Sequence, residues 1–421
     1  MTVTATIAAS AIADSRPSRE PAPARPPAGR RSLTVLQLGL GWFPEQPGGL
    51  DRYYYELLRA LPNQGVNFRG LVVGSEAVAA STGGRVRAVA PKSATIFRRL
   101  RAVRSAVNET VRSGDVELLV SHFALYAAGA LGAMGRLPNV VHFHGPWAAE
   151  SRAEGGGRMA CQGKAVLERA VYQRASRLIC LSEAFAEILR RDYRIAPDRI
   201  RVVPGGVDVS RFDIAGSRPA ARERLGWPAG RPIVLCVRRL VQRMGLTNLV
   251  EAAAAVRRQV PDALVLIAGR GPMSDRLRQQ IAQLGLNDMV KLLGYVPDAE
   301  LPLAYRAADL TIVPSTALEG FGLVAAESLA AGTPALVTPV GGLPEVVHGL
   351  APQWVLEGSA PAQLGERMVA MLAGRLGAVA PEACAAYVRR HFDWSIIAAR
   401  VREVYAEVLG VAPCQTVNAT C

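Results

Sequence analysis

Residues 309–339 read DLTIVPSTALEGFGLVAAESLAAGTPALVTP, and this stretch decides the fold class of the chain. Two short apolar runs, at 309–315 and 334–339, flank a longer stretch of helix-forming residues. Strand, helix and strand in this order are typical of a parallel sheet whose strands are joined by crossover helices. The stretch therefore predicts an α/β protein with a doubly wound, Rossmann-like sheet.

The same alternation recurs along the chain. In the first half it predicts strands at 33–40, 68–74, 116–123, 139–145, 177–182 and 199–206. In the second half it predicts strands at 232–238, 263–269, 290–294, 309–315 and 334–339. A polar linker is expected after Asp208, and 421 residues exceed what one core usually serves. We therefore expect two Rossmann-like domains, 32–210 and 225–390, and a C-terminal helix, 391–410, that packs back on the first domain.

The N-terminal residues, the longest uncharged run and the cysteines bear on the cellular location of the protein. Residues 1–31 are rich in Pro, Ala and Arg and lack the pattern of a signal peptide, so a disordered tail is expected. The run 118–135 contains Ser121, His122 and three glycines, which favours a buried strand and core helix over a membrane span. The six cysteines show no disulfide or zinc spacing. A cytoplasmic protein is expected.

The net charge of +14 is concentrated in the first half of the chain. Residues 1–212 carry a net charge of +12, and residues 213–421 carry +2. The basic residues are scattered except for a run at 98–104, where a solvated helix face is favoured over a binding patch. The basic half leads us to expect weak peripheral contact with an anionic membrane face, and no nucleic-acid partner.

Two glutamates mark the loop and helix within the opening stretch. Glu319 follows a strand, and the carboxyl ends of strands are where open α/β sheets bind ligands. Gly320 and Gly322 let backbone N–H groups approach an anion at the start of a helix. Glu327 lies on that helix within an apolar stretch, where its carboxylate could hold the hydroxyls of a ribose. A binding role is favoured because an unpaired buried carboxylate is costly.

This pattern resembles the donor-site signature of retaining GT-B glycosyltransferases, specifically glycosyltransferase family four. The resemblance covers residues 33–409 and implies two domains that face each other across a cleft. The first domain would bind the acceptor and the second the nucleotide-sugar donor. The resemblance also implies that Glu319 contacts hydroxyls of the transferred sugar and that Glu327 holds the ribose. Backbone amides facing the donor are implied for Phe321, Gly322 and Leu323.

Several arginines follow the first strand of the second domain. Guanidinium groups at a strand end suit a pyrophosphate, because each can bind phosphate oxygens through two hydrogen bonds. The family has an arginine, a lysine five positions later and then a glycine. Alignment on Arg239 and Gly245 places Met244 at the lysine position. The cation must then come from Arg243, or the register must shift to pair Arg238 with Arg243, in a turn that we expect to be exposed.

Two features of the first domain complete the expected site. Gly48 and Gly49 precede a helix and resemble the family loop that closes over the donor diphosphate. His142 and His144 share one face of a strand that ends at Gly145. The family has a histidine at this strand end that faces the acceptor and the donor sugar, and His144 matches it better than His142. His122 is a weaker candidate, and a core role remains open for the histidines.

The expected reaction is retaining transfer of a hexose-type sugar from a nucleotide-sugar to a glycan, lipid-linked or small-molecule acceptor, in polysaccharide or glycoconjugate synthesis. No Asp-x-Asp motif lies at a strand end, so no metal and no other cofactor is expected. Arginines and helix ends would neutralise the leaving diphosphate. Two alternatives remain: a nucleotide-sugar epimerase of the same fold, and a non-catalytic nucleotide-sugar-binding subunit, since Met244 replaces the family lysine.

Overall fold

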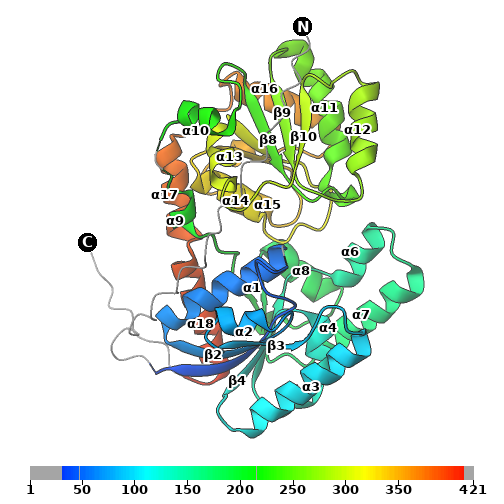
Figure 1. Ribbon diagram of the computed structural model, residues 1–421, viewed down its shortest axis with the longest axis vertical. Coiled ribbons are helices and arrows are strands. Elements are labelled where there is room, and N and C mark those ends of the chain that lie inside the picture. The colour runs from blue at the N-terminus through cyan, green and yellow to red at the C-terminus, as the bar shows by residue number, and fades with distance from the viewer. Residues whose placement is uncertain (1–30, 47, 215, 412–421) are drawn as a thin grey trace.

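The computed structural model describes residues 31–46, 48–214 and 216–411. Within these residues the chain folds into two α/β domains, which lie one above the other in Figure 1. Each domain is built on its own parallel sheet. The tail expected over residues 1–31 lies outside the described residues, except for Arg31.

The N-terminal domain contains a seven-stranded sheet in the order β3-β2-β1-β4-β5-β6-β7. Its strands are β1 Leu33–Leu38, β2 Val66–Val73, β3 Val86–Ala90, β4 Leu118–Ser121, β5 Asn139–Phe143, β6 Arg177–Cys180 and β7 Ile200–Val202. All except β3 fall on runs expected from the sequence. Strand β3 was not expected because its five residues, VRAVA, form too short a run to distinguish from a loop.

The helices of this domain cover both faces of the sheet. They are α1 Gly49–Ala60, η1 Leu61–Gln64, α2 Ala77–Ser81, α3 Ile96–Arg112, α4 Ala124–Ala127, η2 Ala128–Ala130, α5 Leu131–Met134, α6 Trp147–Ala153, α7 Arg158–Tyr172, α8 Glu183–Arg191 and η3 Pro197–Arg199. After β4 the uncharged run forms three short helical segments instead of one core helix. Gly129 and Gly132 lie in these segments, and glycine is a poor helix former. Among the described helices, none is long and apolar enough to cross a membrane.

The C-terminal domain contains a five-stranded sheet in the order β10-β9-β8-β11-β12. Its strands are β8 Ile233–Val237, β9 Leu264–Ala268, β10 Val290–Gly294, β11 Leu310–Val313 and β12 Ala335–Val337. Its helices are α9 Val209–Phe212, α10 Arg218–Leu225, η4 Gln242–Met244, α11 Leu246–Gln259, α12 Ser274–Gln283, α13 Leu301–Ala307, α14 Leu323–Ala330, α15 Leu343–Val347, η5 Pro352–Trp354, α16 Pro361–Leu372 and α17 Pro381–His391. All five strands fall on runs expected from the sequence.

Helix α10 occupies part of the segment that was expected to be a linker. Ser217 caps its N-terminus, and Gly226 ends it in the left-handed conformation, with φ of 63°. The buried Arg222 side chain donates to the carbonyl of Ala307 at 2.9 Å and pairs with Asp309 at 2.7 Å. These contacts fix α10 to the C-terminal domain, so this part of the linker expectation is wrong.

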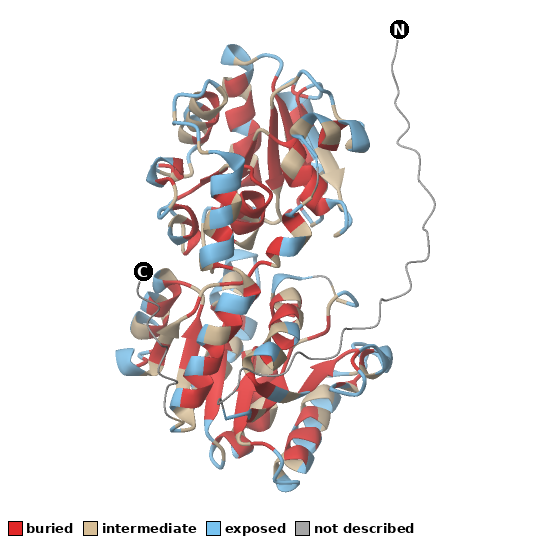
Figure 2. Ribbon diagram, turned by 90° about the vertical axis from the view of Figure 1, so that its left-hand side faces the viewer, coloured by how far each residue is buried: buried red, intermediate tan, exposed pale blue. Residues whose placement is uncertain are grey.

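The last helix, α18 Trp394–Val408, returns from the C-terminal domain and packs on the N-terminal one (Figure 1). Alternate residues of β1 face opposite layers of helices, because side chains alternate along a strand. Leu33 and Val35 share a core with Ile397 and Val401 of α18. Figure 2 shows the buried residues gathered along the strands of both sheets and the exposed ones on the outer helices.

Candidate functional site

A cleft of about 1020 Å³ separates the two domains at the carboxyl ends of their strands. The loops that follow β1, β4 and β5 line it from the N-terminal domain, and those after β8, β9, β10 and β11 line it from the C-terminal domain. Every residue that the sequence proposed for the site lines this cleft: Gly48, Gly49, His144, Arg239, Arg243, Glu319, Phe321, Gly322, Leu323 and Glu327.

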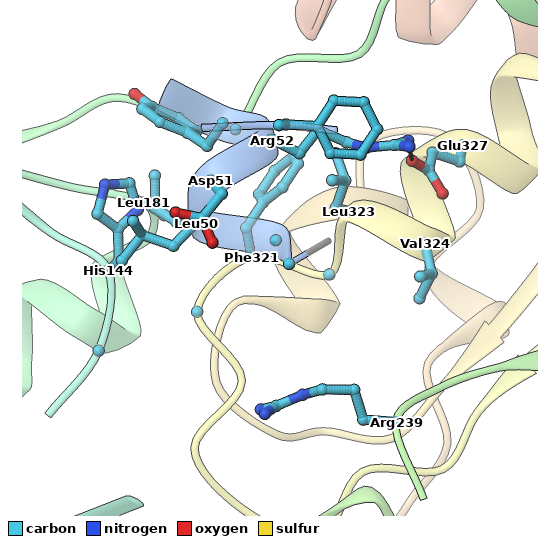
Figure 3. Close-up of a pocket in the computed structure, with 18 of the residues that line it drawn as sticks. Leu50, Asp51, Arg52, His144, Leu181, Arg239, Phe321, Leu323, Val324 and Glu327 are labelled. Carbon is cyan, nitrogen blue, oxygen red and sulfur yellow. Dashed lines mark hydrogen bonds and ion pairs between the residues drawn. The ribbon is translucent and has the colours of Figure 1, made fainter. Parts of the chain in front are cut away.

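Helix α14 begins at the wall of the cleft (Figure 3). Its N-cap residue, Gly322, has φ of 97°, and a Cβ there would lie 2.4 Å from Leu343 Cδ2. Glycine is required at this position because an L side chain would be both strained and obstructed. The backbone N–H groups of Phe321, Gly322 and Leu323 donate to no other group in the described chain. They are therefore available to an anion at the positive end of the helix.

The carboxylate of Glu327 is almost completely buried, with 4% of the residue exposed. The Tyr305 hydroxyl donates to Oε2 at 2.9 Å, and the Arg52 guanidinium lies 3.4 Å from Oε1. Burial raises the pKa of Glu327, and the Arg52 charge opposes this rise. These partners explain how a carboxylate persists inside an apolar helix, and they place it at the cleft wall.

Glu319 interacts closely with Arg238. The Arg238 guanidinium pairs with Glu319 Oε2 and donates to the Ser315 hydroxyl. Ser315 in turn donates to Glu319 Oε2 at 3.1 Å. Arg238 is thus held beside a carboxylate, and the register that would make Arg238 and Arg243 a pair of phosphate ligands is not favoured.

The turn that carries Arg243 is buried, contrary to the expectation that it is exposed. Only 6% of Arg243 is exposed, and its Nε donates to Glu154 Oε1 at 3.1 Å. The turn folds under the loop after β11 because Gly245 adopts φ of 69°, where a Cβ would lie 1.8 Å from the Pro314 carbonyl oxygen. Met244 is also buried, with Sδ 3.9 Å from the Ser315 hydroxyl.

Arg239 has a different environment. Its side chain is exposed, lines the cleft and extends into the space beside the start of α14 (Figure 3). It makes no hydrogen bond or ion pair with any residue that the structure describes. A guanidinium of this kind can bind phosphate oxygens without first leaving another partner.

Three histidines meet on the N-terminal side of the cleft. His122 Nε2 lies 2.9 Å from the amide oxygen of Gln37, and His122 Nδ1 lies 3.4 Å from His144 Nε2. A carbonyl oxygen only accepts, so Nε2 of His122 carries the proton and Nδ1 can accept from His144. His142 lies deeper, between the hydroxyls of Tyr53 and Tyr405. The structure therefore places His144 at the cleft and gives His142 hydrogen-bond partners in the core.

Burial keeps all three histidines neutral at physiological pH. Desolvation lowers the pKa of His144 to about 3. The pKa values of His122 and His142 also fall well below the usual range, first because of burial and then because of the neighbouring rings. A neutral His144 is able to accept a hydrogen bond from a substrate hydroxyl.

These histidines are also the group of side chains closest to a metal-binding arrangement in the described chain. Their candidate ligand atoms lie within 4.8 Å of one another. However, the rings of His122 and His142 stack with centroids 4.2 Å apart and an interplanar angle of 21°. The lone pair of an imidazole nitrogen lies in the ring plane, so stacked rings do not converge on one ion. The geometry favours a hydrogen-bond network.

Sequence reasoning missed the residues that reach the site from the opposite domain. Arg52, in the first turn of α1, pairs with Asp298 and Glu327 of the C-terminal domain. Asp298 also pairs with Arg211 at 2.6 Å. Glu154 approaches Arg243 from the end of α6. No local signal marks these residues, because their partners lie 87 to 275 positions away in the chain.

Comparison with known proteins agrees with this geometry. A family model described as Glycosyltransferase Family 4 matches residues 47–211, and one described as Glycosyl transferases group 1 matches residues 217–391. A D-inositol 3-phosphate glycosyltransferase from Salinispora arenicola is 33% identical over 333 residues, which are 73% of each chain. This chain belongs to glycosyltransferase family four. The resemblance seen in its sequence is thereby confirmed.

Other relatives of this family-four protein carry the same name. The D-inositol 3-phosphate glycosyltransferase of Thermobispora bispora is 37% identical over 254 residues, 58% of this chain and 58% of the relative. That of Xylanimonas cellulosilytica is 36% identical over 256 residues, 58% of this chain and 60% of the relative. The matched region thus spans less than two thirds of these two relatives.

Solved structures show the same architecture. Sucrose-phosphate synthase from Thermosynechococcus elongatus superposes with a TM-score of 0.72 at 20% identity, over 90% of this chain and all of that one. Anabaena HepE in complex with UDP-glucose gives a TM-score of 0.70 at 20% identity, over 89% of this chain and all of that one. The expected GT-B fold of two Rossmann-like domains is confirmed for this family-four member.

Proposed function

We propose that the chain transfers a sugar from a nucleotide-sugar donor to an acceptor hydroxyl, with retention at the anomeric carbon and without a metal ion. The observation that carries this proposal is the buried carboxylate of Glu327 at the wall of a cleft. The same cleft holds the free backbone amides that begin α14 and the unpaired guanidinium of Arg239. This arrangement offers a partner for a ribose diol next to partners for a diphosphate.

The roles of the donor-site residues follow from their positions. Glu327 would accept from the ribose hydroxyls, and the amides of Phe321, Gly322 and Leu323 would hold the diphosphate. Glu319 would contact hydroxyls of the transferred sugar from the same loop. Anabaena HepE, which shares the fold, has been solved with UDP-glucose. A donor of the same class is therefore the first one we propose for this cleft.

Catalysis would depend on fixed positive charge near the leaving diphosphate. Negative charge develops on the leaving oxygen as the glycosidic bond breaks. Arg239 and the N-terminus of α14 would stabilise that charge without a metal ion. His144, neutral and at the cleft, would accept from a hydroxyl of the sugar or of the acceptor.

The acceptor would bind on the N-terminal side of the cleft, near His144 and α6. Trp147 and Glu150 line this side, and Lys164 lies 4.6 Å from the Trp147 ring. Relatives named D-inositol 3-phosphate glycosyltransferase make a phosphorylated polyol the first small-molecule acceptor to test. Glycan and lipid-linked acceptors are then tested in the same assay.

Weak peripheral contact with an anionic membrane is part of the proposal. Helix α3 presents Phe97, 82% exposed, beside the exposed Arg98, Arg101 and Arg104, while Arg99 donates to the Tyr126 hydroxyl. An exposed aromatic ring among arginines suits a headgroup region, and each well-placed charge contributes about 1 kcal/mol. Binding to anionic vesicles should occur at low salt and be lost at high salt; absence of binding at low salt would contradict it.

The test of the proposed function is a thermal-shift screen of UDP-, GDP- and ADP-sugars. A true donor raises the midpoint of unfolding because it binds only the native state. The stabilising donor is then incubated with inositol phosphate and other acceptors, with and without a chelator. Transfer that survives chelation, with retained configuration in the product, is the expected result. Isomerisation of the donor without an acceptor would indicate an epimerase, and binding without transfer a non-catalytic subunit.

A further inference from the structure

We propose that Arg52, from the N-terminal domain, supplies the second cation to the donor diphosphate in place of the lysine that this chain lacks. Arg52 would leave Glu327 when the ribose arrives and would turn toward the phosphates. The proposal rests on the proposed function, because it requires a nucleotide-sugar in the cleft.

The cations of the turn after β8 are mostly committed to other partners. Arg238 pairs with Glu319, and Arg243 pairs with Glu154 and donates to the Leu318 carbonyl at 3.1 Å. Met244 carries no charge. Arg239 is the one arginine of this turn without a partner among the described residues. A departing diphosphate carries more than one negative charge, so a single guanidinium leaves part of that charge unbalanced.

Arg52 is positioned to balance the remaining negative charge of the diphosphate. It lies in the first turn of α1, three residues after Gly49, and its side chain crosses the cleft toward α14 (Figure 3). Its guanidinium carbon lies 4.7 Å from the centre of the Phe43 ring. This cation–π contact helps to hold the Arg52 side chain in place. The Gly48–Gly49 loop and the Arg52 guanidinium thus approach the donor position from the same side.

The ribose and Arg52 compete for the same oxygen. Glu327 Oε2 already accepts from Tyr305, and Arg52 lies against Oε1. In this proposal, a ribose diol that spans both oxygens of Glu327 takes the place of Arg52 at Oε1. The other partner of Arg52, Asp298, keeps its ion pair with Arg211 when Arg52 leaves. The displaced guanidinium exchanges its two carboxylate partners, Asp298 and Glu327, for the phosphates, so its charge remains paired.

This exchange predicts that loss of Arg52 has different effects on the affinity for a nucleoside and on the affinity for its diphosphate. Removal of Arg52 takes a cation from the diphosphate and a competitor from the ribose. Arg52→Ala should therefore weaken binding of a nucleoside diphosphate at least tenfold and should not weaken binding of the nucleoside. Arg59→Ala is the matched control, because Arg59 lies on the same helix, outside the cleft, and pairs with Glu56.

The experiment is calorimetric titration of wild type and both variants with UDP, GDP and ADP and with the three parent nucleosides. Loss of affinity confined to the diphosphate supports the proposal, and restoration of diphosphate binding by Arg52→Lys supports it further. Equal loss for nucleoside and diphosphate, or no loss for either, overturns it. If wild type binds none of the nucleotides, the proposed function fails together with this inference; if wild type binds and Arg52→Ala binds equally well, the inference alone fails.

A second variant tests whether Arg52 fills the place of the missing lysine. Met244→Lys in the Arg52→Ala background returns a cation to the turn after β8. Partial recovery of diphosphate affinity is expected, with the nucleoside affinity unchanged. If this variant folds and recovers nothing, the cation at Arg52 does not substitute for the lysine, and the proposal is wrong on that point.

Discussion

Arg243 of the C-terminal domain and Glu154 of the N-terminal domain form an ion pair across the cleft, with 3.1 Å between Nε and Oε1. The arginine in the turn expected to bind phosphate instead helps to hold the two domains together. Glu345 adds another bridge, since its carboxylate accepts from the backbone N–H groups of Glu183 and Ala184 at the start of α8. These polar contacts contribute to the relative position of the two domains, together with apolar contacts such as those of Leu181 with the C-terminal core.

Arg243→Ala should lower both stability and activity. The change removes a buried guanidinium and leaves Glu154 and Glu150 without their partner, and both carboxylates are only partly exposed. The expected loss is about 1–2 kcal/mol in the free energy of unfolding, less than for a fully buried pair because water screens the carboxylates. Turnover should fall at least tenfold, since domain closure positions the donor.

A double-mutant cycle with Glu154→Gln separates these effects. If the pair acts as proposed, the two single changes should not add, and the coupling energy should appear in both unfolding and donor affinity. Full activity in Arg243→Ala would show that this ion pair is not needed for closure.

Glu319→Ala should mainly lower turnover. The carboxylate lies beside Arg238 in the loop that would face the transferred sugar, and its contacts should strengthen as positive charge develops on that sugar. We expect at least a tenfold fall in kcat, with KM for the donor changed by less than threefold, measured by steady-state kinetics. Glu319→Gln keeps the shape and tests the charge. A rise in KM alone would contradict the assigned role.

The cluster of His122, His142 and His144 should make the protein less stable in acid. Their pKa values are lowered in the folded state, so below about pH 6.5 the unfolded chain binds protons that the folded chain excludes. Their contribution to stability is complete above pH 6.5 and is lost as the pH falls toward about 3, the pKa of His144. The pKa of Asp51 is raised to about 6 by burial. Protonation of Asp51 therefore stabilises the folded protein as the pH falls below about 6, which offsets part of the stability lost through the histidines.

His142→Gln isolates one of these groups. Glutamine can still bond to the hydroxyls of Tyr53 and Tyr405 but does not titrate. The free energy of unfolding should depend less steeply on pH below pH 6, by up to about 1.4 kcal/mol per pH unit. His348→Gln, at an exposed position, is the control. Equal slopes for wild type and His142→Gln, from chemical unfolding at several pH values, would mean that His142 is not kept neutral.

Much of the fold could be predicted from the sequence, because most of the parallel strands are short apolar runs that can be recognised without knowledge of their partners. Strand β3, helix α10 and the three short helical segments after β4 were the exceptions. The run VRAVA is short and interrupted by charge, and α10 carries four charged residues in eight. Its place in the fold depends on Arg222, whose partners at Ala307 and Asp309 lie far along the chain.

The candidate site could be predicted only where its signal is local. The loop and helix from Glu319 to Glu327 form one short stretch, so their residue types already indicate an anion site beside a carboxylate. The contacts of Arg52 with Glu327 and of Arg243 with Glu154 depend on how two separately folded domains meet. No sequence pattern within either domain specifies the interface between them. The burial of Arg243 was missed for this reason.

The measurement that tests the central claim most directly is calorimetric titration of wild type and Glu327→Ala with the nucleoside diphosphate that stabilises wild type most. If Glu327 holds the ribose, the change should weaken binding by about 1.5–3 kcal/mol, or roughly 10- to 150-fold, because a charge-assisted hydrogen bond is lost. Circular dichroism checks that the variant remains folded. The same affinity in wild type and in folded Glu327→Ala would contradict the claim that this cleft binds a nucleotide through Glu327.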